Sequence, residues 1–342
     1  MYRIRPPLRA FGTPLRSKQT HFHTSRPFLH HRTYKQHPFG RRPQYKRFNN
    51  ASSGLSSLFY RWAARPTFYR DVGLVSLGTG AVYLYNIETV PVSGRRRFNI
   101  IPASLEATMG KLSVEQIHNE YKDDILPDHD PRVQQVKRVL ERLLPYAAGE
   151  GLTDVEWEVT VIDSPEENAF VVPGGKVFVF TGILPLCGGE DGIAAVLGHE
   201  IAHVVAHHTA ERMSHAPIIL LGVIALTFVD VSLYSAKMII DFLLSMPASR
   251  KHEAEADYIG LLMMAQGCYR PEAAMDFWAR MEKSGQRGPP EILSTHPSNH
   301  NREEKIRGWL PEAQQRAEMS ECAITSQYAT QFGAAFDNFP RW

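Results

Sequence analysis

The sequence of 342 residues predicts a mainly helical α+β domain with a small β-sheet. Residues Pro131–Ala148 place apolar side chains at helical spacing, which indicates an amphipathic helix. Two short runs, Trp157–Ile162 and Lys176–Thr181, are rich in β-branched and aromatic residues and are typical of strands. The run Ile193–Val205 is apolar nearly all round, which favours a buried helix. Strands and helices in this order predict an α+β fold.

The first element of the chain is a basic N-terminal segment. Residues 1–70 contain 15 Lys and Arg and no acid, whereas the rest holds 23 basic and 36 acidic residues. A basic, acid-free start is typical of a mitochondrial transit peptide, and no apolar core of a secretory signal occurs here. A basic arm for nucleic acid is the alternative, but no nucleic-acid-binding motif follows. We expect residues 1–70 to be a transit peptide and disordered arm, and we expect no nucleic-acid partner.

Residues 71–110 are expected to form a candidate membrane anchor and a linker. The stretch Val72–Ile87 is apolar or small. As a helix it would span about 24 Å, somewhat less than the bilayer core of about 30 Å. A soluble linker helix is the alternative. The linker itself is expected at residues 95–110.

The catalytic domain is expected at residues 111–315, with an apolar insertion at 217–246. Asp230, Lys237 and Asp241 interrupt this insertion, and charges inside a bilayer are costly. It therefore reads either as a membrane segment or as a buried or membrane-dipping helical hairpin. Further helices are expected from about Pro271 and from about Pro297, followed by a C-terminal extension at 316–342. Three widely spaced cysteines leave any disulfide pairing open.

The candidate site begins with His199-Glu200-Ile201-Ala202-His203 inside the apolar run. Residues four apart on a helix lie on one face, so both imidazoles can reach one metal ion. Glu200 would lie beside that metal, where it could accept a proton from water. A buried glutamate without a partner is costly, which favours this interpretation over two histidines that merely pack in a core.

A catalytic zinc needs a third protein ligand. His207 lies on the same helical face, four residues after His203, but it would be about 12 Å along the helix axis from His199. A metzincin continuation is excluded because Ala206 and Thr209 stand where that motif needs glycine and histidine.

A better source of the third ligand is the segment from Lys251 to Gly260. On a helix Glu253 and Asp257 share a face, while Glu255 points about 200° away from Glu253. One of the two carboxylates on that face can bind zinc while the other orients a ligating imidazole. A solvated acidic face is the alternative, but the apolar continuation after Asp257 favours a helix packed on the core.

These motifs together resemble the zincin superfamily that contains the CAAX prenyl proteases and bacterial heat-shock membrane metalloproteases. The resemblance covers roughly residues 115–310, and the similarity is greatest to the Oma-type endopeptidases of the mitochondrial inner membrane. The segments that carry it are His199–His203, Glu253-x-x-Ala256-Asp257, Asn168–Gly175, and Ser294-Thr295-His296-Pro297 followed by Arg302.

The resemblance implies a gluzincin-like site for one zinc ion. Its ligands would be His199, His203 and Glu253, with Asp257 orienting a ligand and Glu200 acting as general base. His296 would face the metal and stabilise the oxyanion, although it could equally be a histidine at the start of a helix. The strand Lys176–Phe180 would align an extended substrate as an added strand.

The resemblance also implies an ATP-independent zinc metalloendopeptidase facing the intermembrane space. Expected partners are inner-membrane lipid, damaged membrane proteins and a dynamin-like fusion GTPase, with a homo-oligomer as one option. Two alternatives stay open: a prenyl-peptide protease of the same fold, and a catalytically silent, zinc-containing membrane scaffold or chaperone.

Overall fold

The computed structural model describes residues 52–147, 155–227, 231–284, 296, 301–320 and 322. Contacts divide the chain into residues 1–54 and 55–342, and the following description concerns the second unit. Most of the predicted transit peptide and arm, 1–70, lies outside the described residues, as does most of the predicted C-terminal extension, 316–342.

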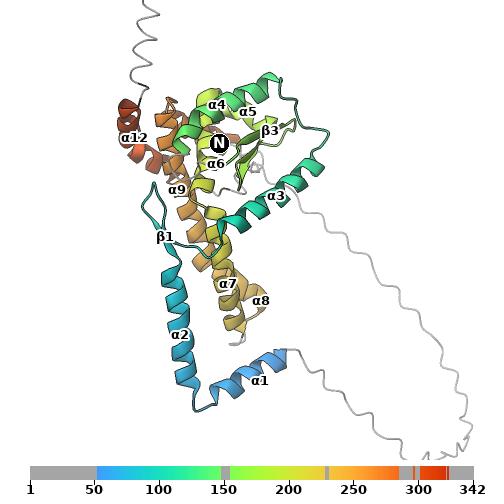
Figure 1. Ribbon diagram of the computed structural model, residues 1–342, viewed down its shortest axis with the longest axis vertical. Helices are drawn as coiled ribbons and strands as arrows, with labels where there is room; N and C mark the ends of the chain where they lie inside the picture. Colours follow the sequence, from blue (N-terminus) through green and yellow to red (C-terminus); the bar gives the residue numbers. More distant parts are fainter. Residues whose placement is uncertain are drawn as a thin grey trace, which may run out of the picture. The chain divides into compact units, whose positions relative to one another are not determined.

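Helices dominate the described residues, and the strands are short (Figure 1). The helices are α1 (Ser52–Ala63), α2 (Phe68–Tyr85), α3 (Ala103–Glu120), α4 (Pro131–Ala147), α5 (Leu184–Cys187), α6 (Glu190–Val205), α7 (His208–Thr227), α8 (Leu233–Ile240), α9 (Met246–Gln266), α10 (Glu272–Ser284) and α12 (Arg302–Met319). The strands are β1 (Ile87–Thr89), β2 (Arg96–Phe98), β3 (Glu158–Ile162), β4 (Ala169–Val172) and β5 (Lys176–Phe180). Two shorter turns are η2 (Thr181–Ile183) and the π-helical η3 (Asp241–Ser245). The predicted fold class, a mainly helical α+β domain with a small sheet, is confirmed.

The larger sheet has the order β3-β5-β4, with β3 parallel and β4 antiparallel to β5. Alternate residues face two cores, as the period of two requires. Val159 and Val177 join the main core of helices, whereas Phe178 and Phe180 pack with Ile117 of α3. The sheet is therefore covered by helices on both faces.

The central position of β5 corrects one expectation from the sequence. Both hydrogen-bonding edges of Lys176–Phe180 are already paired, one with β3 and the other with β4. This strand therefore cannot take up a substrate as an added strand. Among the described residues β4 pairs only with β5, and it packs against α6.

The helices α6 and α9 form the centre of the main core and pack closely along each other. Their contact is possible because glycines meet at it. A Cβ atom on Gly260 would lie 2.8 Å from the backbone nitrogen of His199, and one on Gly198 would lie 3.0 Å from the carbonyl oxygen of Gly260. Backbone atoms cannot rotate away as side chains do, so this close approach requires glycine at both positions.

The described part of the apolar insertion 217–246 is helical, which is compatible with both interpretations of the sequence. It comprises most of α7, all of α8 and the turn η3, and α7 packs against α8. In Figure 1 these helices project away from α4 and α5. Many of their apolar side chains are exposed: Ile218, Leu220, Leu221, Ile224, Leu233, Tyr234, Met238, Phe242, Leu243 and Leu244.

Within the described residues, α7 is the helix that is long and apolar enough to cross a membrane by length and composition. The candidate anchor, Val72–Ile87, lies mainly in α2, which has the length but does not meet the same hydropathy criterion. No residue of α2 is buried. The assignment of this stretch as an anchor stays a prediction.

Residues 95–110, expected as a linker, instead contain β2 and the first part of α3. β1 and β2 form an antiparallel hairpin in which Ile87 pairs with Phe98. Three consecutive arginines, Arg95, Arg96 and Arg97, stand at the start of this expected linker. In the structure Arg97 is buried, and it donates to Glu88 at 2.8 Å and to the carbonyl oxygen of Ala206.

A disulfide joins Cys268, just after α9, to Cys322. The sequence left this pairing open because three cysteines allow several pairs. Cys187 is free and buried, and burial raises the pKa of its thiol to about 12.

Candidate metal centre

The two histidines of the pentapeptide lie on α6, which begins after Gly188 and Gly189. Both glycines have positive φ, a conformation that other residues rarely adopt, and Glu190 and Asp191 follow in the first helical turn. One turn of helix separates His199 from His203, and their Nε2 atoms lie 3.1 Å apart. The helical spacing therefore brings both imidazoles to one point, as predicted.

Two further groups reach that point from distant parts of the chain. Glu253 of α9 places its carboxylate 3.3 Å from Nε2 of His199 and 3.6 Å from Nε2 of His203. Nδ1 of His296 lies 3.2 Å from Glu253 and 3.3 Å from Nε2 of His199. One ligand atom from each of the four residues falls within 4.8 Å of the others.

The structure also places Asp257 beside this cluster. Its Oδ1 lies 2.9 Å from Nδ1 of His199, on the ring edge opposite the cluster. Arg302 donates to the same oxygen at 2.6 Å, and its guanidinium lies 3.2 Å above the ring of Trp278. Arg302 was noted in the sequence without a role, because only the folded chain shows what it contacts.

Glu200 is buried at the cluster, with only 3% of its surface exposed. Its Oε1 has no hydrogen-bond partner within the described residues, and Nε2 of His296 is 3.4 Å away. Burial raises the pKa of this carboxyl group. A buried carboxylate oxygen without a donor is costly unless something else occupies the space beside it.

The charge states of Glu253 and His203 suit a bound cation. Burial alone would raise the pKa of Glu253, but hydrogen bonds with His199 and His296 outweigh it and hold that pKa below the usual range. Burial lowers the pKa of His203 well below its ordinary value. Glu253 is thus an anion and His203 a neutral imidazole, which are the forms that bind metal. Imidazole nitrogens with one carboxylate are a donor set that zinc accepts.

Two residues considered from the sequence lie elsewhere. His207, excluded by distance, contacts Glu106 at 2.7 Å. Glu255, which the helical geometry directed away from Glu253, contacts Ser93, Arg95 and His208. No motif in the sequence indicates that His208 and Arg95 belong to this region. Pro297 and the residues before His296 lie outside the described residues.

A buried cluster of this kind, on a mainly helical α+β frame, defines a metal-dependent hydrolase of the zincin type. Residues 131–310 match peptidase family M48, and the chain belongs to that family. It is a metallopeptidase.

Known relatives specify the branch of the family. The chain is 46% identical over 253 residues to the mitochondrial metalloendopeptidase OMA1 of Schizosaccharomyces pombe, which covers 73% of this chain and 74% of the relative. It is 37% identical over 305 residues to OMA1 of Saccharomyces cerevisiae, and the match covers 85% of this chain and 88% of the relative. Human OMA1 is 36% identical over 269 residues, and the match covers 73% of this chain and 51% of the human protein. The resemblance to Oma-type endopeptidases is confirmed, and the chain is mitochondrial.

Proposed function

We propose that this protein is a zinc metalloendopeptidase of the mitochondrial inner membrane, with its catalytic domain facing the intermembrane space. It would act without ATP in membrane-protein quality control and process a dynamin-like fusion GTPase. The observation that carries the proposal is the unpartnered Oε1 of Glu200 beside four converging metal-binding groups. The mitochondrial relatives and the exposed apolar helices support the location.

The ligands we propose are His199, His203 and Glu253. When bound, zinc supplies a Lewis acid that makes water more acidic and polarises a substrate carbonyl. Oε1 of Glu200 accepts a proton from the attacking water and later delivers it to the leaving amine. Asp257, held by Arg302, keeps the ring of His199 in place by accepting from its Nδ1–H.

His296 is the residue we propose for stabilising the oxyanion. Nε2 of its ring points to Glu200, so it can donate to negative charge that develops on the substrate oxygen. Its Nδ1 faces Glu253, which can hold the ring in place. The free edge of β4, which packs against α6, would align an extended substrate.

Two other functions remain as alternatives. A prenyl-peptide protease would need a closed chamber made of several membrane-spanning helices. Among the described residues, α7 alone is long and apolar enough to cross a membrane. A silent scaffold would keep zinc for folding only and would have no use for Glu200 as a proton acceptor. The two classes of function therefore differ in what Glu200 does.

We expect Glu200→Gln to retain zinc and to reduce cleavage of an unfolded membrane protein by about 10²–10⁴-fold. Glutamine keeps the shape of the side chain but cannot carry the proton. Bound zinc and cleavage are measured on the same preparation. Glu190→Gln, on the same helix but at the surface in contact with Arg138, is the control and should be fully active. Undiminished cleavage by the Glu200 variant would refute the mechanism.

The proposed location has a separate test. Mitochondria with an opened outer membrane are treated with an external protease, and the catalytic domain is followed by antibody. Its digestion would support a domain facing the intermembrane space. Protection until the inner membrane is dissolved would place it in the matrix instead.

A further inference from the structure

His208 lies directly behind the proposed ligand His203. Five residues along a continuous helix would turn its ring about 140° away. The chain breaks at His207, which has φ of +47°, and α7 starts at His208 in a new direction. As a result Nδ1 of His208 lies 2.8 Å from Nδ1 of His203, and His208 is completely buried.

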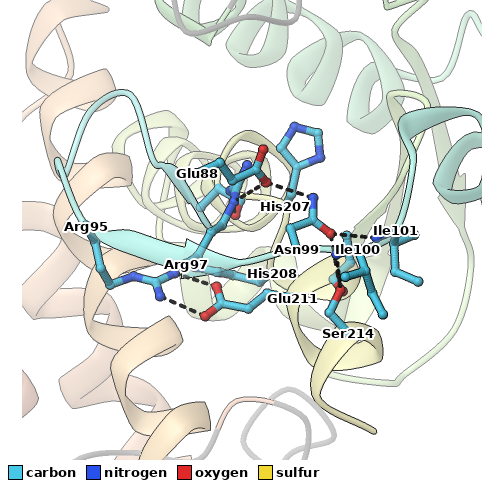
Figure 2. Close-up of polar contacts among 12 residues, drawn as sticks. Glu88, Arg95, Arg97, Asn99, Ile100, Ile101, His207, His208, Glu211 and Ser214 are labelled. Atoms are coloured by element: carbon cyan, nitrogen blue, oxygen red, sulfur yellow. Dashed lines mark hydrogen bonds and ion pairs between the residues drawn. The ribbon is translucent and has the colours of Figure 1, made fainter. Parts of the chain in front are cut away.

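The other side of the His208 ring contacts a buried carboxylate. Nε2 lies 2.9 Å from Oε2 of Glu255, and Nε of Arg95 donates to the same oxygen at 2.8 Å. The other carboxylate oxygen, Oε1, accepts a hydrogen bond from Ser93. The remaining two nitrogens of Arg95 donate to Glu211 at 2.8 and 2.6 Å, in the bidentate arrangement drawn in Figure 2.

The hydrogen atoms in this chain of contacts can be assigned from chemistry. A neutral His203 that presents Nε2 to a metal carries its hydrogen on Nδ1. That N–H must donate to Nδ1 of His208, so His208 carries its own hydrogen on Nε2 and donates it to Glu255. Every contact then has one donor and one acceptor, and Glu255 is the final acceptor, to which Nε of Arg95 also donates.

We propose that His208 is a positioning residue for His203, and that Arg95 in the β1–β2 hairpin holds this arrangement in place through Glu255. This rests on the proposed function only in taking His203 as a metal ligand. Acceptors behind a ligating imidazole fix its ring and its tautomer, and their loss typically weakens metal binding by about 10–100-fold. The usual acceptor is a carboxylate or a carbonyl group; here a second histidine stands between ligand and carboxylate.

The first test replaces the His208 ring in the full-length protein in detergent. We expect His208→Phe to weaken zinc binding by about 10–100-fold, because phenylalanine keeps the packing but accepts no hydrogen bond. His208→Asn should restore most of the affinity, since its amide oxygen can take the place of Nδ1. Affinity is measured by competition with a chelator, and the metal-free melting temperature reports folding. Unchanged affinity in the Phe variant, or equal losses in both folded variants, would overturn the proposal.

The second test concerns Arg95 and does not depend on whether a His208 variant folds. We expect Arg95→Met to accelerate zinc release to the chelator at least severalfold. Arg96→Met, on the neighbouring exposed residue, is the matched control and should release zinc at the wild-type rate. Equal release rates in the two variants would refute the role of Arg95.

The outcomes distinguish failure of the proposed function from failure of the inference alone. Absence of zinc binding in the wild-type protein would refute the proposed function and the inference together. Normal zinc binding that is insensitive to both His208 and Arg95 would refute the inference and leave the peptidase mechanism intact.

Discussion

The helix α6 with the second half of α9, and the α7–α8–η3 hairpin, are both strongly apolar in sequence, yet they have opposite surroundings. Leu262 in α9 is 2% exposed, whereas Leu221 in α7 is 66% exposed. The first pair buries its apolar side chains against other helices, and its polar side chains converge on the candidate metal centre. The hairpin presents its apolar side chains outward, as a surface in contact with lipid would require. Hydropathy alone therefore does not distinguish a protein core from a membrane-facing surface.

The largest expected difference between the two regions concerns leucine truncation. Leu262→Ala should lower the free energy of unfolding by about 2–5 kcal/mol, because it leaves a cavity in a packed core. Leu221→Ala should change it by less than about 0.5 kcal/mol in detergent, since this side chain is 66% exposed and its loss leaves no cavity in a core. Thermal or denaturant unfolding of both variants measures the contrast. A large loss in Leu221→Ala would show that another protein surface covers the hairpin.

A smaller contrast is expected between two glycines. Gly260→Ala should lower the free energy of unfolding by about 1–3 kcal/mol and weaken metal binding, because its Cβ would press on the backbone at Gly198 and His199. In the hairpin, a Cβ on Gly222 would lie 3.1 Å from the side chain of Ile240, which can move. Gly222→Ala should therefore cost less than about 1 kcal/mol. The two variants are compared by unfolding for stability and by chelator competition for zinc affinity. Equal losses of stability in the two variants would contradict the close contact between α6 and α9.

The smallest expected effect is a dependence on pH. In the metal-free cluster burial lowers the pKa of His199, but hydrogen bonds with Asp257 and Glu253 raise it to about 9. Zinc needs the neutral ring, so a proton on His199 competes with the metal below that pH. Zinc affinity should rise by up to about tenfold per unit between pH 6 and 9 and then level off.

The stability of the metal-free protein should depend on pH in the opposite direction from zinc affinity. A protonated His199 stabilises that form at low pH, and the contribution is lost as pH rises through about 9. Membrane association through the hairpin should stay constant over the same range, because its exposed apolar side chains do not titrate. Chelator competition measures zinc affinity, unfolding measures the stability of the metal-free protein, and vesicle flotation measures membrane association. Zinc affinity that is flat with pH would contradict the raised pKa.

The parts of the site that the sequence predicted are those that local geometry determines. The spacing of His199 and His203 follows from one helical turn, and the opposite directions of Glu253 and Glu255 follow from two residues on a helix. Glu253 reaches the histidines only through the packing of α9 on α6. From the residues alone, Glu253 and Asp257 were equivalent candidates, and the resemblance to a family was needed to choose between them.

The parts that the sequence did not predict depend on contacts between distant residues. Arg95 reads as one of three basic residues after an apolar stretch, and only the fold shows that it reaches Glu255. His208 should point away from His203 on a continuous helix, and the break at His207 has no glycine or proline to signal it. The partner of Cys268 was likewise set by the fold.

The hairpin divides the candidate metal centre along the chain: His199 and His203 precede it, and Glu253 and His296 follow it. A chain that emerges N-terminus first, from a ribosome or an import channel, therefore completes the centre only after the whole hairpin has emerged. The metal centre therefore cannot form before the hairpin has been synthesised or imported. The linear order of these residues thus makes the candidate site one of the last parts of the chain to be completed as it emerges.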